Sequence, residues 1–321
     1  MKLGSARSAL CCTLLALSCS RSPERADHER PSSSATSTAA DGAAPRPDGG
    51  PPALLYLPDG GDVVQSGTAP SLLPGMPPAL SRCPAEMVDI RGRYCIDRYE
   101  VTLVDEKGGR RLSPYYHPTR SQTAASLKEW TAYARGQTVA VPLPPDFQLS
   151  EEFEPRAESR EGVTPNGYLS GNLAEVACRN AGKRLCTVDE WVFACRGEAA
   201  HKFPYGDHFE DGVCNVFREA HPGQILHGDM SIGHLDPRLN LVQGSAGPLL
   251  RKTGATSACR STWGNDAVYD MVGNLDEWVN AERGAFLGGF YSRSTREGCD
   301  SKVSSHPRAY FDYSLGTRCC R

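Results

Sequence analysis

The placement of cysteine most constrains how this chain can fold. Of the 13 cysteines among 321 residues, three lie at positions 11, 12 and 19, and the other ten lie between Cys83 and Cys320. An even number of cysteines behind an export signal is typical of a domain that disulfides hold together in an oxidising compartment. The sequence therefore predicts one disulfide-stapled domain over 83–321, near the upper end of the length that one core supports.

An export signal begins the chain. Two basic residues precede the apolar stretch Ala9 to Leu17, which is too short to span a bilayer. The run Leu15-Ala16-Leu17-Ser18-Cys19 resembles a bacterial lipobox, which predicts a signal peptide over 1–19 and lipidation of Cys19. Simple secretion after cleavage is the alternative. Because Ser20 is not Asp, the resemblance implies the outer membrane of a Gram-negative bacterium, on its periplasmic or its surface-facing side.

Residues 20–82 are rich in Pro, Ser, Ala, Gly and Asp and show no hydrophobic period. Such a segment cannot bury enough apolar surface to fold, so we expect a disordered tether. A flexible chain of about 60 residues spans on the order of 40 Å, which would let the domain stand clear of a membrane.

Charge limits the class of partner. The formal net charge is -3, the pI is near 6.3, and no run of Lys or Arg interrupts the chain. We therefore expect no nucleic-acid partner, and contact with a membrane only through the N-terminal lipid.

Local patterns predict a β-hairpin and two helices. Residues 87–90 and 94–97 alternate in character around a Gly-containing turn, and a Cys83–Cys95 disulfide would staple this hairpin. Residues 172–180 have helical spacing and stop near Gly182. Thr187-Val188-Asp189-Glu190 is a capping box that starts a second helix, ending at Gly197.

The remaining segments show little periodicity. Prolines interrupt 105–166, which we expect to form an excursion over one face, with a short helix over 126–134. Beyond Gly197 we expect no helix longer than two turns. A glycine-rich, loop-rich domain of this kind needs disulfides or metal ions to hold its backbone.

Several motifs occur in the order found in one protein family. This order resembles the formylglycine-generating-enzyme (sulfatase-modifying factor) family over 84–320. The motifs are Gly182-Lys183-Arg184-Leu185, Glu190-Trp191, Ala194-Cys195-Arg196-Gly197, Phe203-Pro204-Tyr205-Gly206, Asn215-Val216, Tyr269 to Trp278, Gly288-Gly289-Phe290-Tyr291 and Gly316-Thr317-Arg318-Cys319. The resemblance implies an α+β variant of the C-type-lectin-like fold with little regular secondary structure.

The resemblance also implies calcium. Its ligands would be the side chains of Asp270 and Glu277 and the carbonyls of Gly273 and Leu275, and a tight acidic turn of this kind can point several oxygens at one ion. A solvated acidic turn is the alternative. A second family site would use Asn215 and the carbonyl of Val216, without further ligands that can be placed.

The family's best-known chemistry needs two more cysteines than this chain offers. Its enzymes oxidise a substrate cysteine to formylglycine with oxygen and a copper(I) ion held by two thiolates, the ligands that suit this soft ion. Arg293 and Gly298 stand at the two thiolate positions, and Cys299 falls one place late. We therefore expect no copper site, no catalytic residues and no oxidase activity.

The resemblance assigns two disulfides, Cys178–Cys319 and Cys195–Cys299. Four further cysteines have no family template, and among their possible pairings we favour Cys186–Cys320 and Cys214–Cys259. Sequence alone leaves this connectivity open. Zinc is disfavoured because the chain has no C-x-x-C pair and its histidines show no metal-binding spacing.

Two functions compete. The first is a non-catalytic, calcium-supported, monomeric binding module for an envelope protein, a peptide or a glycan, with a groove that would favour an acidic or polar ligand. Its lining would be Tyr291, Arg293, Arg296, Trp263 and Arg308, although surface ion pairs are the simpler interpretation of the arginines. The second is a family enzyme that modifies a cysteine or peptide substrate with oxygen. The sequence does not identify the ligand or substrate.

Overall fold

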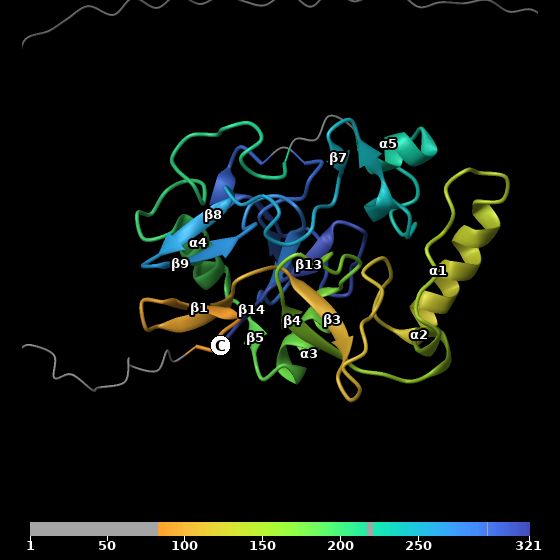
Figure 1. Cartoon of the computed structure of the whole chain (residues 1–321), viewed down its shortest axis with the longest axis horizontal. Helices are drawn as coiled ribbons and strands as arrows, with labels where there is room; N and C mark the ends of the chain where they lie inside the picture. The colour runs from red at the N-terminus through yellow and green to blue at the C-terminus, as the bar shows by residue number, and fades with distance from the viewer. Residues whose placement is uncertain (1–82, 217–220, 294) are drawn as a thin grey trace, which may run out of the picture. The chain divides into compact units, whose positions relative to one another are not determined.

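The computed structural model describes residues 83–216, 221–293 and 295–321 (Figure 1). The predicted signal peptide, the lipidation site Cys19 and the tether over 20–82 lie outside these residues. Within the described part of the chain, none of the helices combines the length and apolar character that a bilayer span requires.

The first sheet joins the two ends of the domain. Its strands follow the order β1 (Met87–Ile90), β2 (Tyr94–Asp97), β14 (Cys319–Cys320) and β5 (Arg184–Leu185), and all neighbours are antiparallel. The predicted hairpin is thus confirmed. Arg91 and Gly92, in the three-residue loop between the strands, both have positive φ, and Asp89 accepts a hydrogen bond from the Gly92 amide.

The second sheet carries the loops of the candidate site. Its order is β12 (Lys302–Val303), β11 (Ala285–Leu287), β10 (Asp276–Val279) and β13 (Leu315–Thr317), with β10 and β13 parallel. Every residue of β10 is buried, because neighbouring strands flank it and helices pack nearby. This burial decides the electrostatics of Asp276 and Glu277 described below.

Three two-stranded sheets complete the β-structure. They pair β3 (Val101–Asp105) with β4 (Pro155–Ser159), β6 (Gln243–Gly244) with β7 (Gly247–Pro248), and β8 (Arg260–Trp263) with β9 (Asp266–Tyr269). β4 lies within the Pro-rich excursion, for which the sequence predicted only a short helix. Pro155 is tolerated there because it is the first residue of its strand.

The two helices with clear end signals form as predicted. α3 (Gly171–Asn180) begins after Ser170, whose side chain accepts a hydrogen bond from the Leu173 amide. α4 (Val188–Arg196) begins with the predicted capping box of Thr187 and Glu190, and Gly197 with positive φ ends it.

The helix of the excursion differs from its prediction. We expected 126–134, whereas α1 spans Arg120–Tyr133. Only Thr123 and Trp130 are buried along it, so no apolar period marks its first turns in the sequence. The other helices are short: α2 (Asp146–Ser150), α5 (Pro222–His227), and the 3₁₀ turns η1 (Leu239–Leu241) and η2 (Gly298–Asp300). The described residues after Gly197 thus contain no helix longer than two turns, as expected.

Candidate functional site

Five disulfides staple the described domain. They are Cys83–Cys95, Cys178–Cys319, Cys186–Cys320, Cys195–Cys299 and Cys214–Cys259, which are the five pairs favoured from the sequence. The adjacent cysteines of β14 connect to α3 and to the residue that follows β5. Such a disulfide-dense domain indicates folding in an oxidising, extracytoplasmic compartment.

The two positions at which the resemblance places copper thiolates do not fit copper. Arg293 occupies the first position. Gly298 occupies the second, with a φ of +61°, and a Cβ built on it would lie 2.4 Å from the Lys202 carbonyl oxygen. The neighbouring Cys299 is buried in its disulfide with Cys195. Copper(I) needs soft thiolate ligands, and every cysteine of the described residues is a disulfide half.

Arg293, at the first of these positions, forms an ion pair. The Arg293 guanidinium donates to Asp276 Oδ1 at 2.6 Å, and the Gly289 amide donates to the same oxygen at 3.0 Å. Asp276, at the start of β10, is buried, and burial raises the pKa of its carboxyl to about 7, with Arg293 opposing this rise. Arg293 keeps 28% of its side chain exposed, so the pair lies at the edge of the core.

The loop that carries Arg293 depends on two glycines. Gly288 and Gly289 have φ values of +90° and +75°. A Cβ on Gly288 would meet the Met271 carbonyl oxygen at 2.6 Å, and one on Gly289 would overlap the Thr295 side chain. The loop can therefore reach Asp276 only because these residues have no side chain.

Aromatic rings and one histidine form a hydrogen-bonded network beside this loop. Tyr291 donates its hydroxyl to Asn240 Oδ1 at 2.9 Å, and Asn240 donates to the Tyr313 carbonyl at 2.7 Å. The Tyr313 hydroxyl lies 2.7 Å from His221 Nε2. Because His221 Nδ1 accepts from the Gly223 amide, Nε2 carries the proton and donates to Tyr313.

This network is electrically neutral near pH 7. Burial raises the pKa of both Tyr291 and Tyr313, and burial lowers the pKa of His221, with His234 adding to the effect. The network therefore offers fixed, uncharged hydrogen-bonding groups. It supplies neither an activated nucleophile nor a strong base.

The predicted calcium ligands lie in a buried charge cluster. Both Glu277 carboxylate oxygens accept from the Arg318 guanidinium, at 2.6 and 2.7 Å, and Oε2 also accepts from Trp191 Nε1. Asp270 accepts from the Gly254 amide, and burial raises its pKa to about 6. The carbonyl-bearing residues Gly273 and Leu275 lie between them in the same turn. Among the described residues, no group of three or more His, Cys, Asp or Glu side chains is placed to hold a metal ion.

Sequence reasoning missed one member of this cluster, Glu100. Its carboxyl accepts from the Leu275 amide at 2.9 Å and from the Asn274 side chain. Burial, and the nearby Asp270 and Glu277, raise the pKa of Glu100 well above its usual value, which favours its neutral form. Glu100 precedes β3 in a segment with no metal-site pattern, so no sequence signal pointed to it.

The second predicted calcium site contains an unpaired oxygen. The Asn215 side-chain amide nitrogen donates to the Leu249 carbonyl and to Asn274 Oδ1, both at 2.9 Å. Its Oδ1 is buried and has no hydrogen-bond partner within the described residues. Amide and carbonyl oxygens are calcium ligands, so Asn215 and the neighbouring carbonyl of Val216 fit that ion in ligand type.

The five groove candidates do not line one open groove. Tyr291 is fully buried, and Trp263 is 4% exposed, with its indole donating to the Ala194 carbonyl. Arg308 pairs with Glu175 of α3, and Arg296 lies over the Phe209 ring. Tyr291, Arg293 and Arg296 share the segment between β11 and η2, and Arg293 is the one that pairs with Asp276.

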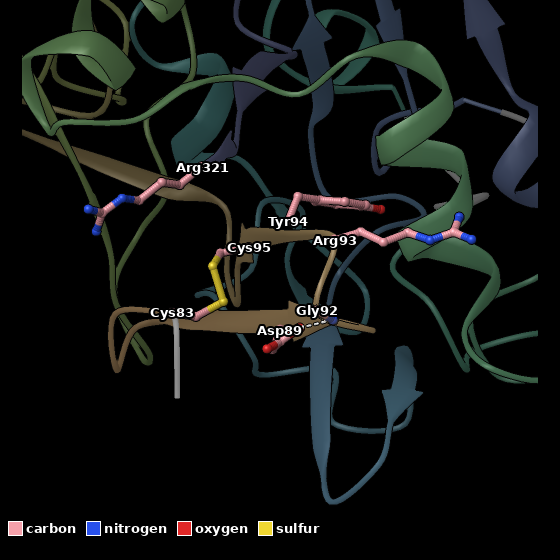
Figure 2. Close-up of a pocket in the computed structure, with 7 residues that line it drawn as sticks. All are labelled: Cys83, Asp89, Gly92, Arg93, Tyr94, Cys95 and Arg321. Carbon is pink, nitrogen blue, oxygen red and sulfur yellow. Dashed lines mark hydrogen bonds between the residues drawn. A yellow bond between two sulfur atoms is a disulfide. The ribbon is translucent and has the colours of Figure 1, made fainter. Parts of the chain in front are cut away.

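A surface pocket lies elsewhere, at the first hairpin (Figure 2). The Cys83–Cys95 disulfide forms part of its wall, and Arg93 and Arg321 extend to opposite sides of it (Figure 2). The two guanidinium groups therefore do not converge on one point of the pocket. None of the residues predicted to bind a ligand or a metal lines it.

Three comparisons relate the chain to known proteins. A curated relative, the inactive C-alpha-formylglycine-generating enzyme 2 of Bos taurus, is 26% identical over 125 residues, which are 37% of this chain and 33% of that protein. This chain thus spans about a third of the length of that relative. A crystal structure of CarF covers 71% of this chain and 86% of its own at 15% identity, with a TM-score of 0.35. A structure of PvdO from Pseudomonas aeruginosa covers 71% and 80% at 15% identity, with a TM-score of 0.34.

A family model extends over most of the chain. The model of the sulfatase-modifying factor enzyme 1-like domain matches residues 44–305. With its mixed α and β elements, short strands and five disulfides, this chain belongs to the sulfatase-modifying factor enzyme 1-like family.

Proposed function

We propose that this domain is an extracytoplasmic binding module and not a copper-dependent oxidase. One observation carries the proposal: at the two positions where the resemblance implies thiolates, Arg293 pairs with Asp276, and Gly298 has no room for a side chain. A guanidinium in an ion pair cannot replace a thiolate as a copper(I) ligand. What remains beside it is the neutral network of Tyr291, Asn240, Tyr313 and His221, which suits binding better than redox chemistry.

The comparison with the bovine protein agrees with this proposal. That relative's name describes an inactive formylglycine-generating enzyme. A domain of this kind can therefore exist without the oxidase activity, as a binding module would. The similarity to the bovine protein extends over 125 residues.

The proposal includes a lipid anchor at Cys19 and structural calcium. The anchor rests on the lipobox-like run at the end of the signal peptide. Calcium is supported by the buried, unpaired Asn215 Oδ1. Asn215 and the carbonyl of Val216 would hold the ion, which would supply a positive charge to the buried, unpaired amide oxygen.

The oxidase question has a direct test. The full chain is purified from an oxidising compartment, loaded with copper(I) and incubated in oxygen with a cysteine-containing peptide. The mass of the peptide is then measured by mass spectrometry. We expect the peptide cysteine to stay unconverted. Conversion to formylglycine above the level of a protein-free copper control would disprove the proposal.

Calcium is tested separately. We expect calcium to raise the melting temperature of the full chain above its value in chelator. The shift should disappear in Asn215→Leu, which keeps a side chain of similar volume without the oxygen. An equal rise in melting temperature in the parent and in Asn215→Leu would show that calcium binds at a site other than Asn215.

A further inference from the structure

The exposed large apolar side chains of the described residues are confined to two segments. Seven such side chains are between 39% and 83% exposed, and we call them the apolar surface: Tyr133, Val139, Leu143, Ile225, Met230, Ile232 and Leu235. Single exposed apolar residues are normal, whereas exposed apolar residues that gather on one part of a surface are typical of an interaction site. Among the described residues, no other segment exposes a large apolar side chain to this extent.

Contacts between these segments hold the apolar surface together. The His227 ring of α5 packs against Trp130 and Tyr133 of α1, with ring centroids 5.7 and 5.3 Å apart. Ser126 of α1 donates to the Leu235 carbonyl at 3.2 Å. Figure 1 shows α1 and α5 at the same end of the domain.

A buried arginine adds a second connection. Arg238 is fully buried and donates to Gln137 Oε1 at 2.6 Å and to the Val139 carbonyl at 3.3 Å. Its remaining donors bind the buried carboxylate of Asp236. Because a buried charge of this kind is costly to unpair, the two segments are fixed relative to each other.

The contact between α1 and α5 also holds unpaired polar groups. Trp130 Nε1 and both ring nitrogens of His227 are buried without a hydrogen bond inside the described residues. His227 Nε2 lies 3.1 Å from Asp236 Oδ2, within ion-pair range but outside hydrogen-bond geometry. Buried polar atoms without a hydrogen bond are rare in folded proteins, so these three atoms distinguish the contact between α1 and α5 from an ordinary core contact.

Charge indicates the kind of partner. Residues 133–143 contain one charged side chain, Arg135, and residues 225–235 contain one carboxylate, Asp229. The Asp229 carboxylate already accepts from the Ser231 amide and hydroxyl, both at 2.7 Å. Depletion of charge is the mark of a protein interface core, whereas anionic lipid attracts clusters of basic residues.

We propose that the apolar surface docks a protein partner through an apolar, uncharged segment of that partner. The inference goes beyond the proposed function, because it does not depend on the loss of oxidase chemistry. It also differs from the acidic or polar ligand that the arginines suggested from the sequence. The surface connects to the neutral network, since the His234 ring stacks on Tyr313.

Selection from a phage-displayed library of random dodecapeptides against the full chain tests this inference. We expect the selected peptides to be rich in large apolar residues and poor in charge. Their affinity should fall about tenfold or more in Met230→Lys or Ile232→Lys, because each variant places a charge in the apolar surface. Ala124→Lys, which adds the same charge to an exposed position of α1 outside the surface, should bind as the parent does.

Three results would overturn the inference. Acidic peptides whose binding needs Arg293 would move the partner site to the Asp276 loop and leave the proposed binding role standing. Binding of phosphatidylglycerol vesicles that Ile232→Lys abolishes would identify a membrane surface. Concentration-dependent dimers that Ile232→Lys dissociates would identify a second copy of the chain. Formation of formylglycine would contradict only the proposed function.

Discussion

At the scale of single residues, Gly298 leaves no room for a side chain at the second position where the resemblance implies a copper thiolate. Gly298 and Gly92 have nearly the same φ, +61° and +67°. A Cβ on Gly92 would meet nothing within 4 Å, whereas one on Gly298 would clash with the Lys202 carbonyl and crowd the Phe203 ring. Because the two φ values are so close, the left-handed conformation should disfavour a side chain by a similar free energy at both positions. The difference in stability between the two alanine variants therefore measures the cost of the clash at Gly298.

We predict that Gly298→Ala destabilises the domain more than Gly92→Ala does. The left-handed conformation should cost each variant roughly 1 kcal/mol, and overpacking should add roughly 1 to 3 kcal/mol at Gly298. Urea denaturation of the two variants and the parent measures the difference. Equal losses would show that Gly298 has room for a side chain, and a second thiolate could then be introduced there.

At the scale of elements, strong end signals decided which ones were predictable from the sequence. The hairpin and helices α3 and α4 carry a turn, a cap or a capping box beside their apolar residues, so local chemistry was sufficient. α1 has only two buried residues and β4 begins with a proline, so tertiary contacts decide both. The pairing of β3 with β4 joins residues about fifty positions apart, which no local pattern encodes.

The candidate site was predictable only in part. The resemblance drew attention to Arg293 as the residue at an implied thiolate position. Its partner Asp276 lies 17 residues earlier and meets it only because β10 and the following loop fold back on each other. Trp263 and Tyr291 were expected at a groove and are core residues instead, since a side chain's exposure depends on elements packed from elsewhere in the chain.

Disulfides tie these short elements together. Cys195–Cys299 joins α4 to η2 across 104 residues, whereas Cys83–Cys95 closes only 12. In the chain-entropy model, a longer closed loop restricts the unfolded chain more. We therefore expect Cys195→Ala/Cys299→Ala to lose roughly 5 kcal/mol of unfolding free energy and Cys83→Ala/Cys95→Ala roughly 3 kcal/mol. Thermal or urea unfolding of both double variants measures the two losses. A larger loss for Cys83→Ala/Cys95→Ala would contradict the expectation and would mean that strain or residual structure in the unfolded chain outweighs loop length.

At the scale of the whole molecule, stability depends on pH through buried groups. His117 packs against the Phe311 ring at a centroid distance of 4.2 Å, and burial lowers its pKa from 6.5 to about 4. Between these values the unfolded chain binds a proton that the folded domain does not. This contribution to stability is therefore complete above about pH 6.5 and is lost as the pH falls toward 4.

We predict that His117→Gln removes this part of the acid sensitivity. Between pH 7 and pH 5 the parent should lose on the order of 2 kcal/mol through this histidine, so the variant should lose less stability than the parent over that range. His208→Gln, at an exposed histidine, should behave as the parent does. Identical pH profiles for the parent and His117→Gln would mean that His117 is accessible to protons in the folded domain.

The central claim is that the cysteines of this domain are structural and none is left for copper. The most direct measurement is a cysteine map: the full chain is unfolded with iodoacetamide but no reductant, digested, and analysed by mass spectrometry. We predict no alkylation at the ten cysteines from Cys83 to Cys320, and a linked peptide pair for Cys195 and Cys299. Quantitative alkylation of Cys299 together with a second cysteine of the domain would contradict the account, because two free thiols would then be available to a copper ion.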